Sequence, residues 1–470
     1  MVMESKWKET ILGEIIKTNI SSYSNKDSWE YVNYLDTGNI TENNIDNIQK
    51  LIVGFDKIPS RAKRKVENGD IIYSTVRPNQ LHYGIIKNKI DNLLVSTGFT
   101  TIRTINTLAD NNFIFWYLTQ AKITKHLQSI GENSTTTYPS IKPSDIEKLQ
   151  INLPPLSEQK AIARILSSLD DKIELNRQMN QTLEQMAQAM FKSWFVDFDP
   201  VFDNALSAEQ AGIANNKAIP EELQAKAEKR KSITNLPDGK AGKKTLPKDI
   251  QELFPDEFEL TEEMGWIPKG WVNKPLSDLI TLIGGGTPKT SIKEYWDGNI
   301  PWFSVVDAPN DSDVFVLETE KKITQLGIDK SSTKLLRSGT TIITARGTVG
   351  KCAFVGKPMT MNQSCYGIVG NNNISDTFIY YAIRESVANL QQKGHGSVFN
   401  TITRDTFKTI LIPFSNEDIT QKFDDIVSEY FDKIKENLIA INNLTQLRDT
   451  LLPKLISGEL RVPEELIEKE

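Results

Sequence analysis

The amino-acid sequence predicts a mixed α/β protein with two tandem globular units, joined and separated by two long antiparallel coiled-coil helices in a pseudo-twofold internal repeat. Three observations support this fold class. Residues 157–194 have the 3.5-residue period of a coiled coil, a second segment 261 residues later repeats it, and each follows a stretch with mixed helix and strand patterns. A repeat of this size indicates two related tasks performed side by side.

The first long helix is expected over 157–194, because a Pro-Pro pair forbids helix before it and Ser157 can cap its first turn. Its seam contains Ile162, Leu166, Leu169, Ile173, Asn176, Asn180, Leu183, Ala187, Met190 and Trp194. The seam of the second helix contains Phe423, Val427, Tyr430, Ile434, Asn437, Ile441, Leu444, Arg448, Leu451 and Leu455. This second helix is expected over 416–452, with Pro453 stopping or kinking it.

Two asparagines, Asn176 and Asn437, occupy matching positions in these seams. We interpret them as a facing pair that fixes the register of the helices at some cost in stability. The alternative is that they are solvated breaks in an imperfect seam.

The sequence pattern divides the chain into six segments. They are a first globular unit at 1–153, a first helical region at 154–198, a linker at 199–264, a second globular unit at 265–413, a second helical region at 414–458 and a tail at 459–470. The linker is rich in Lys, Glu, Ala, Pro and Asn, and we expect only short helices in it, around 221–231 and 248–253.

The first globular unit shows strand patterns at 71–76, 93–97 and 99–102, the last two separated by Gly98. Residues 112–127 read as one amphipathic helix.

The second globular unit repeats these signals. Gly339 precedes a strand as Gly69 does, and Ile402 matches Ile141. The offset between matching positions drifts between 261 and 270, as insertions in loops produce.

Composition narrows the class of protein. The chain has 470 residues, of which 39% are hydrophobic and 25% charged, as in ordinary globular proteins, and no apolar run approaches the length of a membrane span. The start of the chain lacks an apolar signal core, so we expect a cytoplasmic protein in which Cys352 and Cys365 are free buried thiols. The three histidines, His82, His126 and His395, have no metal-ligand spacing, and no metal site is expected.

The net charge of −6 is unevenly distributed. Residues 1–153 carry a net charge of +2 and residues 265–413 carry +4, while the helical regions, linker and tail together carry −12. Because a phosphate-binding surface needs locally placed cations and not a basic chain, the two globular units can bind nucleic acid.

Several motifs resemble those of specificity subunits of type I restriction-modification systems. The central ones are LPPLSEQ at 153–159 and KSWFVDFDP at 192–200. The second globular unit adds GGTPKT at 285–290, EYWDGNIPW at 294–302, ARGTVG at 345–350 and NQS at 362–364; the first adds SRA at 60–62, STVRPN at 74–79 and STGF at 96–99; LLPKLISGEL at 451–460 closes the series. The resemblance covers nearly the whole chain except for about 201–258.

This resemblance implies a non-catalytic subunit that recognises double-stranded DNA with two target recognition domains and takes part in phage defence. Its partners would be two modification (methyltransferase) subunits and the restriction or translocase subunits, which would hold S-adenosylmethionine, ATP and Mg. The residues agree, since the chain lacks an Asn-Pro-Pro-aromatic or Asp-Pro-Pro-aromatic motif, a phosphate loop and a clustered acidic nuclease motif. We expect a bipartite asymmetric target with a fixed gap, each half read by one unit.

The residues expected to contact DNA are polar or basic and lie in or beside these motifs. They are Arg61, Lys63, Arg64, Lys65, Ser74, Thr75, Arg77 and Asn79 in the first unit, and Thr287, Lys289, Thr290, Arg346, Thr348, Asn362 and Gln363 in the second. The alternatives are a solvated charged face for the basic run and salt bridges for Arg77 and Arg346. Trp296 and Trp302 are interpreted as core aromatics and not as base-stacking groups.

The outer face of the first helix is the expected docking surface for a catalytic partner. Its residues include Glu158, Arg164, Lys172, Glu174 and Arg177. Two other functions are alternatives. One is a coiled-coil adaptor that never contacts DNA, which the helices alone fit equally well. The other is a stand-alone methyltransferase or nuclease, which would be active without partners, and we expect no such activity.

Overall fold

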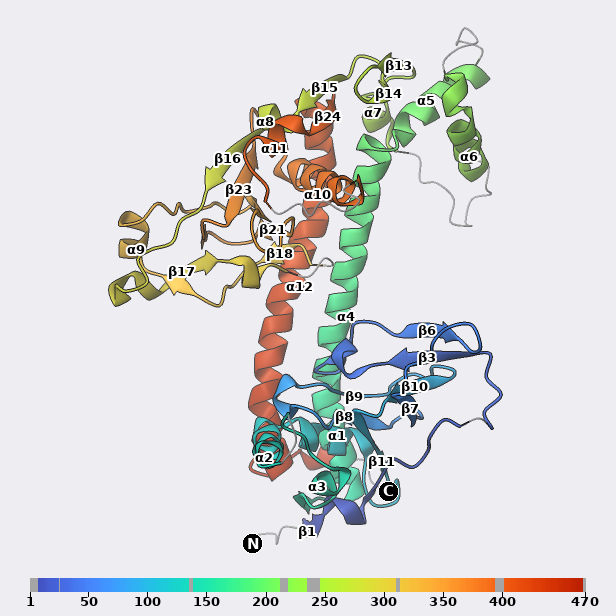
Figure 1. The fold of residues 1–470 in the computed structure, drawn as a ribbon, viewed down its shortest axis with the longest axis vertical. Helices are drawn as coiled ribbons and strands as arrows, with labels where there is room; N and C mark the ends of the chain where they lie inside the picture. The colour runs from blue at the N-terminus through green and yellow to red at the C-terminus, as the bar shows by residue number, and fades with distance from the viewer. Residues whose placement is uncertain are drawn as a thin grey trace. The chain divides into compact units, whose positions relative to one another are not determined.

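The computed structural model describes residues 7–24, 26–134, 138–211, 219–234, 246–309, 313–393 and 401–467. The chain divides into two compact units: the first unit is Met1–Leu175 with Ala440–Glu470, and the second unit is Asn176–Ile439. Each unit contains one globular segment and part of both long helices. The predicted mixed α/β class with two globular segments and two long helices is confirmed (Figure 1).

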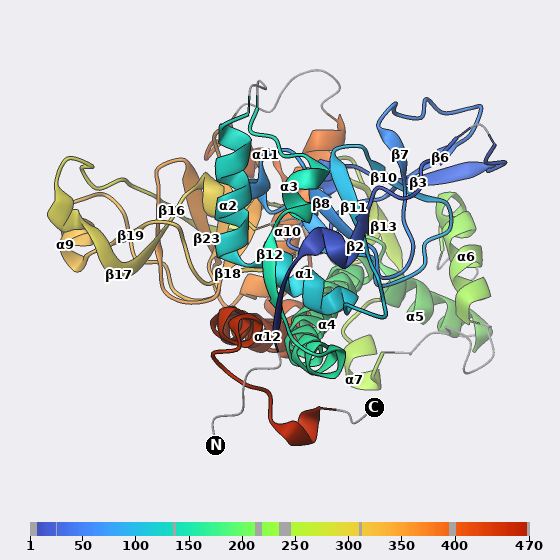
Figure 2. The ribbon, with the colours of Figure 1, turned by 90° about the horizontal axis from the view of Figure 1, so that it is seen from below.

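The globular segment of the first unit contains two four-stranded sheets, in the strand orders β6-β3-β10-β7 and β2-β11-β8-β9. Its strands are β1 (Lys8–Ile11), β2 (Ile16–Thr18), β3 (Tyr31–Leu35), β4 (Ile40–Thr41), β5 (Asn44–Ile45), β6 (Gln49–Ile52), β7 (Ala62–Lys65), β8 (Ile71–Ser74), β9 (Tyr83–Ile85), β10 (Leu93–Ser96), β11 (Phe99–Thr104) and β12 (Gln150–Leu153). Figure 2 shows β3, β6, β7 and β10 as one group. Because β1 pairs with β12, the two ends of the segment lie together.

The helices of this segment are α1 (Asn111–Thr119), α2 (Ala121–Glu132) and α3 (Pro143–Glu147). The prediction of one helix over 112–127 is wrong, because Gln120 is extended (φ −60°, ψ 137°) and separates α1 from α2. The Gln120 side chain is buried, and its Nε2 donates to the Tyr117 carbonyl at 3.0 Å. The six residues at 113–118 are all buried, so α1 is enclosed by the core while α2 is amphipathic.

The globular segment of the second unit has a five-stranded sheet, in the order β16-β23-β20-β21-β18, and a three-stranded sheet, β19-β17-β22. Its strands are β13 (Phe258–Thr261), β14 (Gly265–Pro268), β15 (Val272–Pro275), β16 (Ile280–Gly284), β17 (Trp296–Phe303), β18 (Phe315–Val316), β19 (Lys322–Ile323), β20 (Thr341–Thr344), β21 (Cys352–Val355), β22 (Thr360–Met361), β23 (Cys365–Gly370) and β24 (Leu411–Phe414). Its helices are α8 (Leu276–Leu279), α9 (Gln325–Asp329), α10 (Asp376–Lys393) and α11 (Thr406–Thr409).

The two globular segments share the turn that precedes their central strands. Gly69 precedes β8 with φ +88°, and Gly339 precedes β20 with φ +86°, a conformation that glycine adopts without strain. Gly69 N donates to the Ile86 carbonyl at 2.7 Å, and Gly339 N donates to the Val355 carbonyl at 2.9 Å. The predicted match between these two glycines is confirmed.

Residues 199–264 are folded to a greater extent than the expected linker. The short helices predicted there are present as α6 (Gln224–Thr234) and α7 (Lys248–Gln251), but α5 (Asp199–Gln210) was not predicted. A small core buries Phe202, Ala205, Leu206, Ile219 and Ala227. Arg230 of α6 also binds Asp203 of α5 through two hydrogen bonds, of 2.9 and 3.0 Å. Apolar packing and this ion pair together hold α5 and α6 against each other.

The two long helices are α4 (Leu156–Phe195) and α12 (Glu417–Ser457), which confirms both predicted helices. The expectation that Pro453 ends or kinks the second one near residue 452 is wrong in length, because α12 continues past Pro453 for another turn. Leu452, Leu455 and Ile456 are buried in the core of the first unit, and this packing offsets the hydrogen bond that proline cannot donate. Gly458, with φ +75°, follows the end of the helix.

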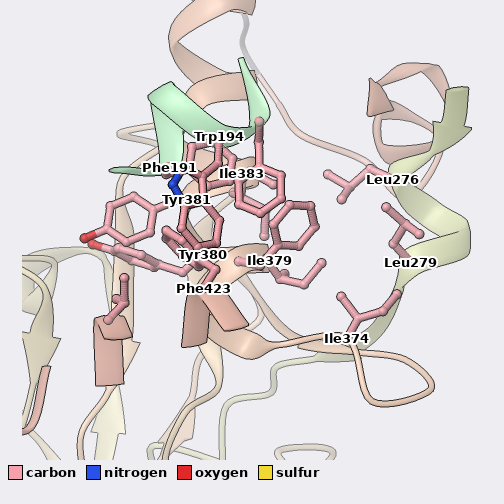
Figure 3. Close-up of a cluster of buried hydrophobic side chains, with 14 of the residues drawn as sticks. Phe191, Trp194, Leu276, Leu279, Ile374, Ile379, Tyr380, Tyr381, Ile383 and Phe423 are labelled. Atoms are coloured by element: carbon pink, nitrogen blue, oxygen red, sulfur yellow. The ribbon is translucent and has the colours of Figure 1, made fainter. Parts of the chain in front are cut away.

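The seams of α4 and α12 are buried to different extents. Ile162, Leu166, Ile173, Phe423, Val427, Ile434 and Asn437 are buried, whereas Leu169, Asn176, Leu183, Met190, Tyr430, Leu444 and Leu451 are half-buried. In the second unit the aromatic seam residues pack against α10 as well as against each other (Figure 3). The ring centroids of Trp194 and Phe423 are 6.0 Å apart, and those of Phe191 and Tyr381 are 5.8 Å apart.

The buried asparagine pair is not the predicted one. Asn437 Nδ2 donates to Asn180 Oδ1 at 2.8 Å, and both residues are buried, with exposed fractions of 4% and 6%. Asn176 is half-buried and takes no part in this pair. In antiparallel helices, residues at equivalent positions face each other only at the symmetry axis, so the partner of Asn437 lies one turn further along α4 than its sequence equivalent.

Candidate nucleic-acid interface

Three loops of the first unit meet at the end of strand β8. Thr75 donates from its N–H to the Gly98 carbonyl at 2.8 Å and from Oγ1 to the same carbonyl at 2.9 Å. The Thr75 carbonyl accepts from Ile141 N at 2.8 Å, and Thr97 N donates to the Arg61 carbonyl at 2.8 Å. Predicted residues from the SRA, STVRPN and STGF motifs are therefore brought to one surface.

Arg77 and Asn79 follow Thr75 on this surface. Arg77 has a left-handed backbone (φ 48°), its N–H donates to the Pro139 carbonyl at 2.9 Å, and its guanidinium lies 4.5 Å from the centre of the Tyr138 ring. Asn79 is exposed, and its backbone N–H donates to Gln128 Oε1 at 3.2 Å. The Arg77 side chain is thus held by a ring stacked on it, in place of the salt bridge that was the alternative to DNA contact.

Tyr138 was missed in the sequence. Tyr138 is 55% exposed, and the Arg77 guanidinium lies over its ring. Its sequence position could have indicated it. Tyr138 lies three residues before Ile141, in the segment that corresponds in the repeat to the residues before Ile402.

Some predicted residues of the first unit are less accessible than their sequence context suggested. Ser74 is 2% exposed, and its hydroxyl donates to the Val76 carbonyl at 2.9 Å and accepts from Val76 N at 3.2 Å. Its hydroxyl is therefore used inside the turn and does not reach a base in this geometry.

The basic run at residues 61–65 is also only partly exposed. Arg61 and Lys63 are exposed, but Arg64 and Lys65 are half-buried. Lys65 is paired with Asp27, lies 5.1 Å from the Trp29 ring, and holds the pKa of the Asp27 carboxyl below its ordinary value through their hydrogen bond. The run is therefore a smaller cationic patch than expected.

In the second unit, the glycines after β16 allow a close crossing of three loops. A Cβ on Gly285 would lie 1.8 Å from the Asn362 carbonyl oxygen, and one on Gly286 would lie 2.3 Å from Ser332 Oγ. Gly286 N also donates to the Met361 carbonyl at 3.0 Å. Glycine is required here because no side chain fits, and not because the backbone is left-handed.

Past this crossing, the GGTPKT loop (residues 285–290) turns to solvent. Thr287, Lys289 and Thr290 are exposed, and Thr287 Oγ1 donates to Oε1 of the exposed Gln363. Asn362 is half-buried, and its Oδ1 accepts from Ser364 N at 2.9 Å, so it stabilises its own turn.

Arg346 and Thr348 extend the same surface. Both are exposed on the loop between β20 and β21. Ala345 N donates to the Ser364 carbonyl at 2.8 Å, which ties this loop to the turn that carries Gln363. The predicted residues of the second unit thus converge from three loops.

The two surfaces share one backbone frame. Thr75 follows β8 and Ala345 follows β20, and the carbonyls of these residues accept from Ile141 N at 2.8 Å and Ile402 N at 2.9 Å. The predicted match between Ile141 and Ile402 is confirmed. The side chains on the two frames differ, since an arginine stacked on tyrosine lies in one unit and a threonine and lysine loop in the other.

The long helices leave some apolar side chains exposed. These are Leu175 (56%) and Leu447 (47%) in the first unit, and Met179 (37%), Met186 (46%) and Ile439 (50%) in the second. Arg164, Lys172 and Arg177 are exposed as expected. The expectation is wrong for Glu158, which accepts from Trp7 Nε1 at 2.9 Å and from Arg461 at 3.1 Å and so connects α4 to both ends of the first unit.

Within the described residues, no three His, Cys, Asp or Glu side chains are grouped so that they could hold a metal ion. His395 lies outside the described residues. Cys365 is buried and Cys352 is half-buried, and neither forms a disulfide. No helix in the described part of the chain is long and apolar enough to cross a membrane.

Comparisons with known proteins identify the family. A family model described as the type I restriction modification DNA specificity domain matches residues 4–185 and 268–443. The type I restriction enzyme HindI specificity subunit of Haemophilus influenzae is 33% identical over 469 residues, which covers 97% of this chain and 100% of that protein. The type I restriction enzyme MjaIX specificity subunit of Methanocaldococcus jannaschii is 32% identical over 192 residues, covering 40% of this chain and 44% of that protein.

A solved structure has the same fold. The type I restriction-modification system S subunit from M. genitalium aligns with a TM-score of 0.54 at 13% identity and covers 97% of each chain.

Proposed function

We propose that the chain reads a bipartite asymmetric DNA target, with one half-site for each globular unit. The premise is that the chain belongs to the type I restriction-modification DNA specificity family. The observation that carries this proposal is the shared backbone frame at Thr75 and Ala345, which presents different side chains in the two units. A common frame with different polar groups suits two related readers of different sequences, because base identity is read by hydrogen bonds to base edges.

Individual roles follow from exposure and charge. Arg77 and Asn79 read bases in the first half-site, because arginine can hydrogen-bond to the edge of guanine and asparagine to the edge of adenine. The exposed Arg61 and Lys63 bind its phosphates, because exposed cations neutralise the DNA backbone. In the second half-site Thr287, Thr290, Arg346, Thr348 and Gln363 read bases and Lys289 binds phosphate.

The coiled-coil adaptor is the competing function, and salt dependence separates the two. A chain that neutralises about six phosphates, in complex with its modification partners, should lose ~1000-fold in affinity for a target duplex between 50 and 200 mM salt. An adaptor would show no specific duplex binding at any salt concentration. Lys63→Ala should reduce the slope of this salt dependence, whereas Lys269→Ala, which removes an exposed lysine that is paired with Glu257 and is not among the predicted DNA contacts, should not.

We infer that catalysis belongs to partner subunits. Two modification subunits dock on the long helices, restriction or translocase subunits join them, and S-adenosylmethionine, ATP and Mg are bound by those partners. The exposed apolar side chains of α4 and α12 support this docking, since such groups mark protein interaction sites on long helices. Native mass spectrometry of the purified complex should give two modification subunits per chain, and Met186→Glu should lower that occupancy more than Lys408→Glu, which changes an exposed lysine outside the long helices.

The long helices also suit a spacer. The 40 residues of α4 span ~60 Å at 1.5 Å per residue, and DNA repeats its groove orientation about every 34–36 Å. A rigid helical pair of this length fixes the unspecified gap between the half-sites.

A further inference from the structure

Two tryptophans of β17 direct their indole N–H groups at the backbone of the GGTPKT loop. Trp302 Nε1 donates to the Gly286 carbonyl at 3.0 Å, and Trp296 Nε1 donates to the Lys289 carbonyl at 3.3 Å. The two rings contact each other edge to face, with centroids 5.1 Å apart and an interplanar angle of 83°. The loop is therefore bound at its start and near its end by one pair of rings.

The strand that contains both tryptophans, β17, is hydrogen-bonded on both sides. β17 lies between β19 and β22 in its sheet, and the Trp302 backbone N–H donates to the Lys321 carbonyl at 3.0 Å. Trp302 is 6% exposed, so its ring is enclosed, whereas Trp296 is half-buried. The interpretation as a core aromatic is confirmed for Trp302, whereas Trp296 is only half-buried and is not a core residue.

Between the two indole contacts, the loop exposes the side chains that the proposed function assigns to DNA. Thr287 and Lys289 are exposed, while the backbone at Gly286 is held from both sides, by the Trp302 indole and by its own hydrogen bond to the Met361 carbonyl. The loop therefore gains its position from β17 and β22 and keeps the Thr287 and Lys289 side chains at the surface.

We infer that Trp296 and Trp302 are positioning residues that set the base selectivity of the second half-site through the GGTPKT loop without contacting DNA. This inference rests on the proposed function. Base discrimination needs donors and acceptors held within a fraction of an ångström of the base edges, and a loop released from its support samples geometries that accept other bases. Loss of an indole N–H should therefore reduce discrimination between bases more than it reduces general affinity for DNA.

The test compares Trp302→Phe and Trp296→Phe with Trp116→Phe in the assembled complex. Trp116 is the matched control, because its Nε1 also donates a 3.0 Å hydrogen bond, to Ser167 Oγ of α4, but it lies in the first unit. The probes are the duplex target identified by methylation mapping and duplexes with one altered base pair in either half-site.

Each β17 variant should lose about tenfold in discrimination against altered base pairs in the second half-site, since one mismatched pair contributes roughly 10- to 100-fold to specificity. Discrimination in the first half-site should stay at the wild-type value, and Trp116→Phe should leave the second half-site unchanged. Equal loss of affinity for matched and altered duplexes, or unchanged discrimination in a folded variant, would overturn the inference. Trp296→Phe, whose ring is only half-buried, decides the question if Trp302→Phe does not fold.

Hydrogen exchange without DNA separates a failure of this inference from a failure of the proposed function. In the wild-type chain the amides of Gly286, Thr287, Lys289 and Thr290 should exchange more slowly than in Trp302→Phe, while the amides of β8 should not differ. A wild-type complex that binds no specific duplex would refute the proposed function. A wild-type complex that binds specifically, with unchanged exchange in the loop of Trp302→Phe, would refute the indole support.

Discussion

Removing one amide of the Asn180–Asn437 pair should destabilise the protein far more than removing the amide of Asn176. The two paired side chains are 6% and 4% exposed and are joined by a 2.8 Å hydrogen bond. In Asn437→Ala the Asn180 amide stays buried without its partner, and the cost of leaving such a group unsatisfied is about 2 kcal/mol of unfolding free energy. Asn176→Ala removes a half-buried side chain outside this pair and should cost no more than about 0.5 kcal/mol.

Urea unfolding of the full chain, followed by circular dichroism at 222 nm, measures both values, provided the dependence on denaturant is unchanged. The double variant Asn180→Leu with Asn437→Leu leaves no orphaned amide and should recover most of the loss, because both polar partners are replaced by apolar groups. Equal destabilisation by Asn437→Ala and Asn176→Ala would refute the reasoning, and so would a double variant that is less stable than either single one.

Three further predictions concern other parts of the chain. Glu184→Gln breaks the ion pair between a buried carboxylate and Arg384 and should lower the unfolding free energy by about 3 kcal/mol. Lys269→Ala, at the exposed pair with Glu257, should change the unfolding free energy by less than about 0.5 kcal/mol. Similar values for the two variants in urea unfolding would contradict this prediction. Burial raises the pKa of the Cys365 thiol to about 12, so iodoacetamide at pH 8 should alkylate Cys352 first, and equal labelling of the two thiols by mass spectrometry would be inconsistent with the structure. Insertion of one helical turn into the middle of α4 should change the length of the unspecified gap and leave both half-site sequences as they were; a methylated target with an unchanged gap would count against the spacer.

The long helices could be predicted from the sequence because their periodicity is local. The 3.5-residue spacing of Ile162, Leu166 and Ile173, all buried in the structure, is visible without any knowledge of what covers them. The partner of Asn437 could not be predicted in the same way. The sequences of the two helices do not fix the position of the pseudo-twofold axis that relates them. The position of this axis decides which residues of the two helices face each other.

Tertiary context also overrides local signals elsewhere. Pro453 predicts a helix end, but Leu455 and Ile456, which follow it, are buried and keep the chain helical. In residues 199–264, the polar composition concealed Phe202, Ala205 and Leu206, whose helical spacing marks the buried face of α5.

The positions of the candidate loops could be predicted where glycines and turns mark them, whereas the exposure of single side chains on them could not. The loops of Thr75, Arg77, Thr287 and Arg346 are placed on two shared frames, as the motifs indicated. Ser74 is taken into its own turn, because the side chain of the last residue of a strand can point inward as easily as outward, and the sequence does not distinguish the two.

Mapping of methylated adenines in DNA from cells that express this chain with its modification and restriction partners tests the central claim most directly. We predict one split, asymmetric target with a fixed gap, in which Arg77→Ala relaxes only one half and Arg346→Ala relaxes only the other. A continuous target, or a single half altered by both substitutions, would contradict the assignment of one half-site to each globular unit.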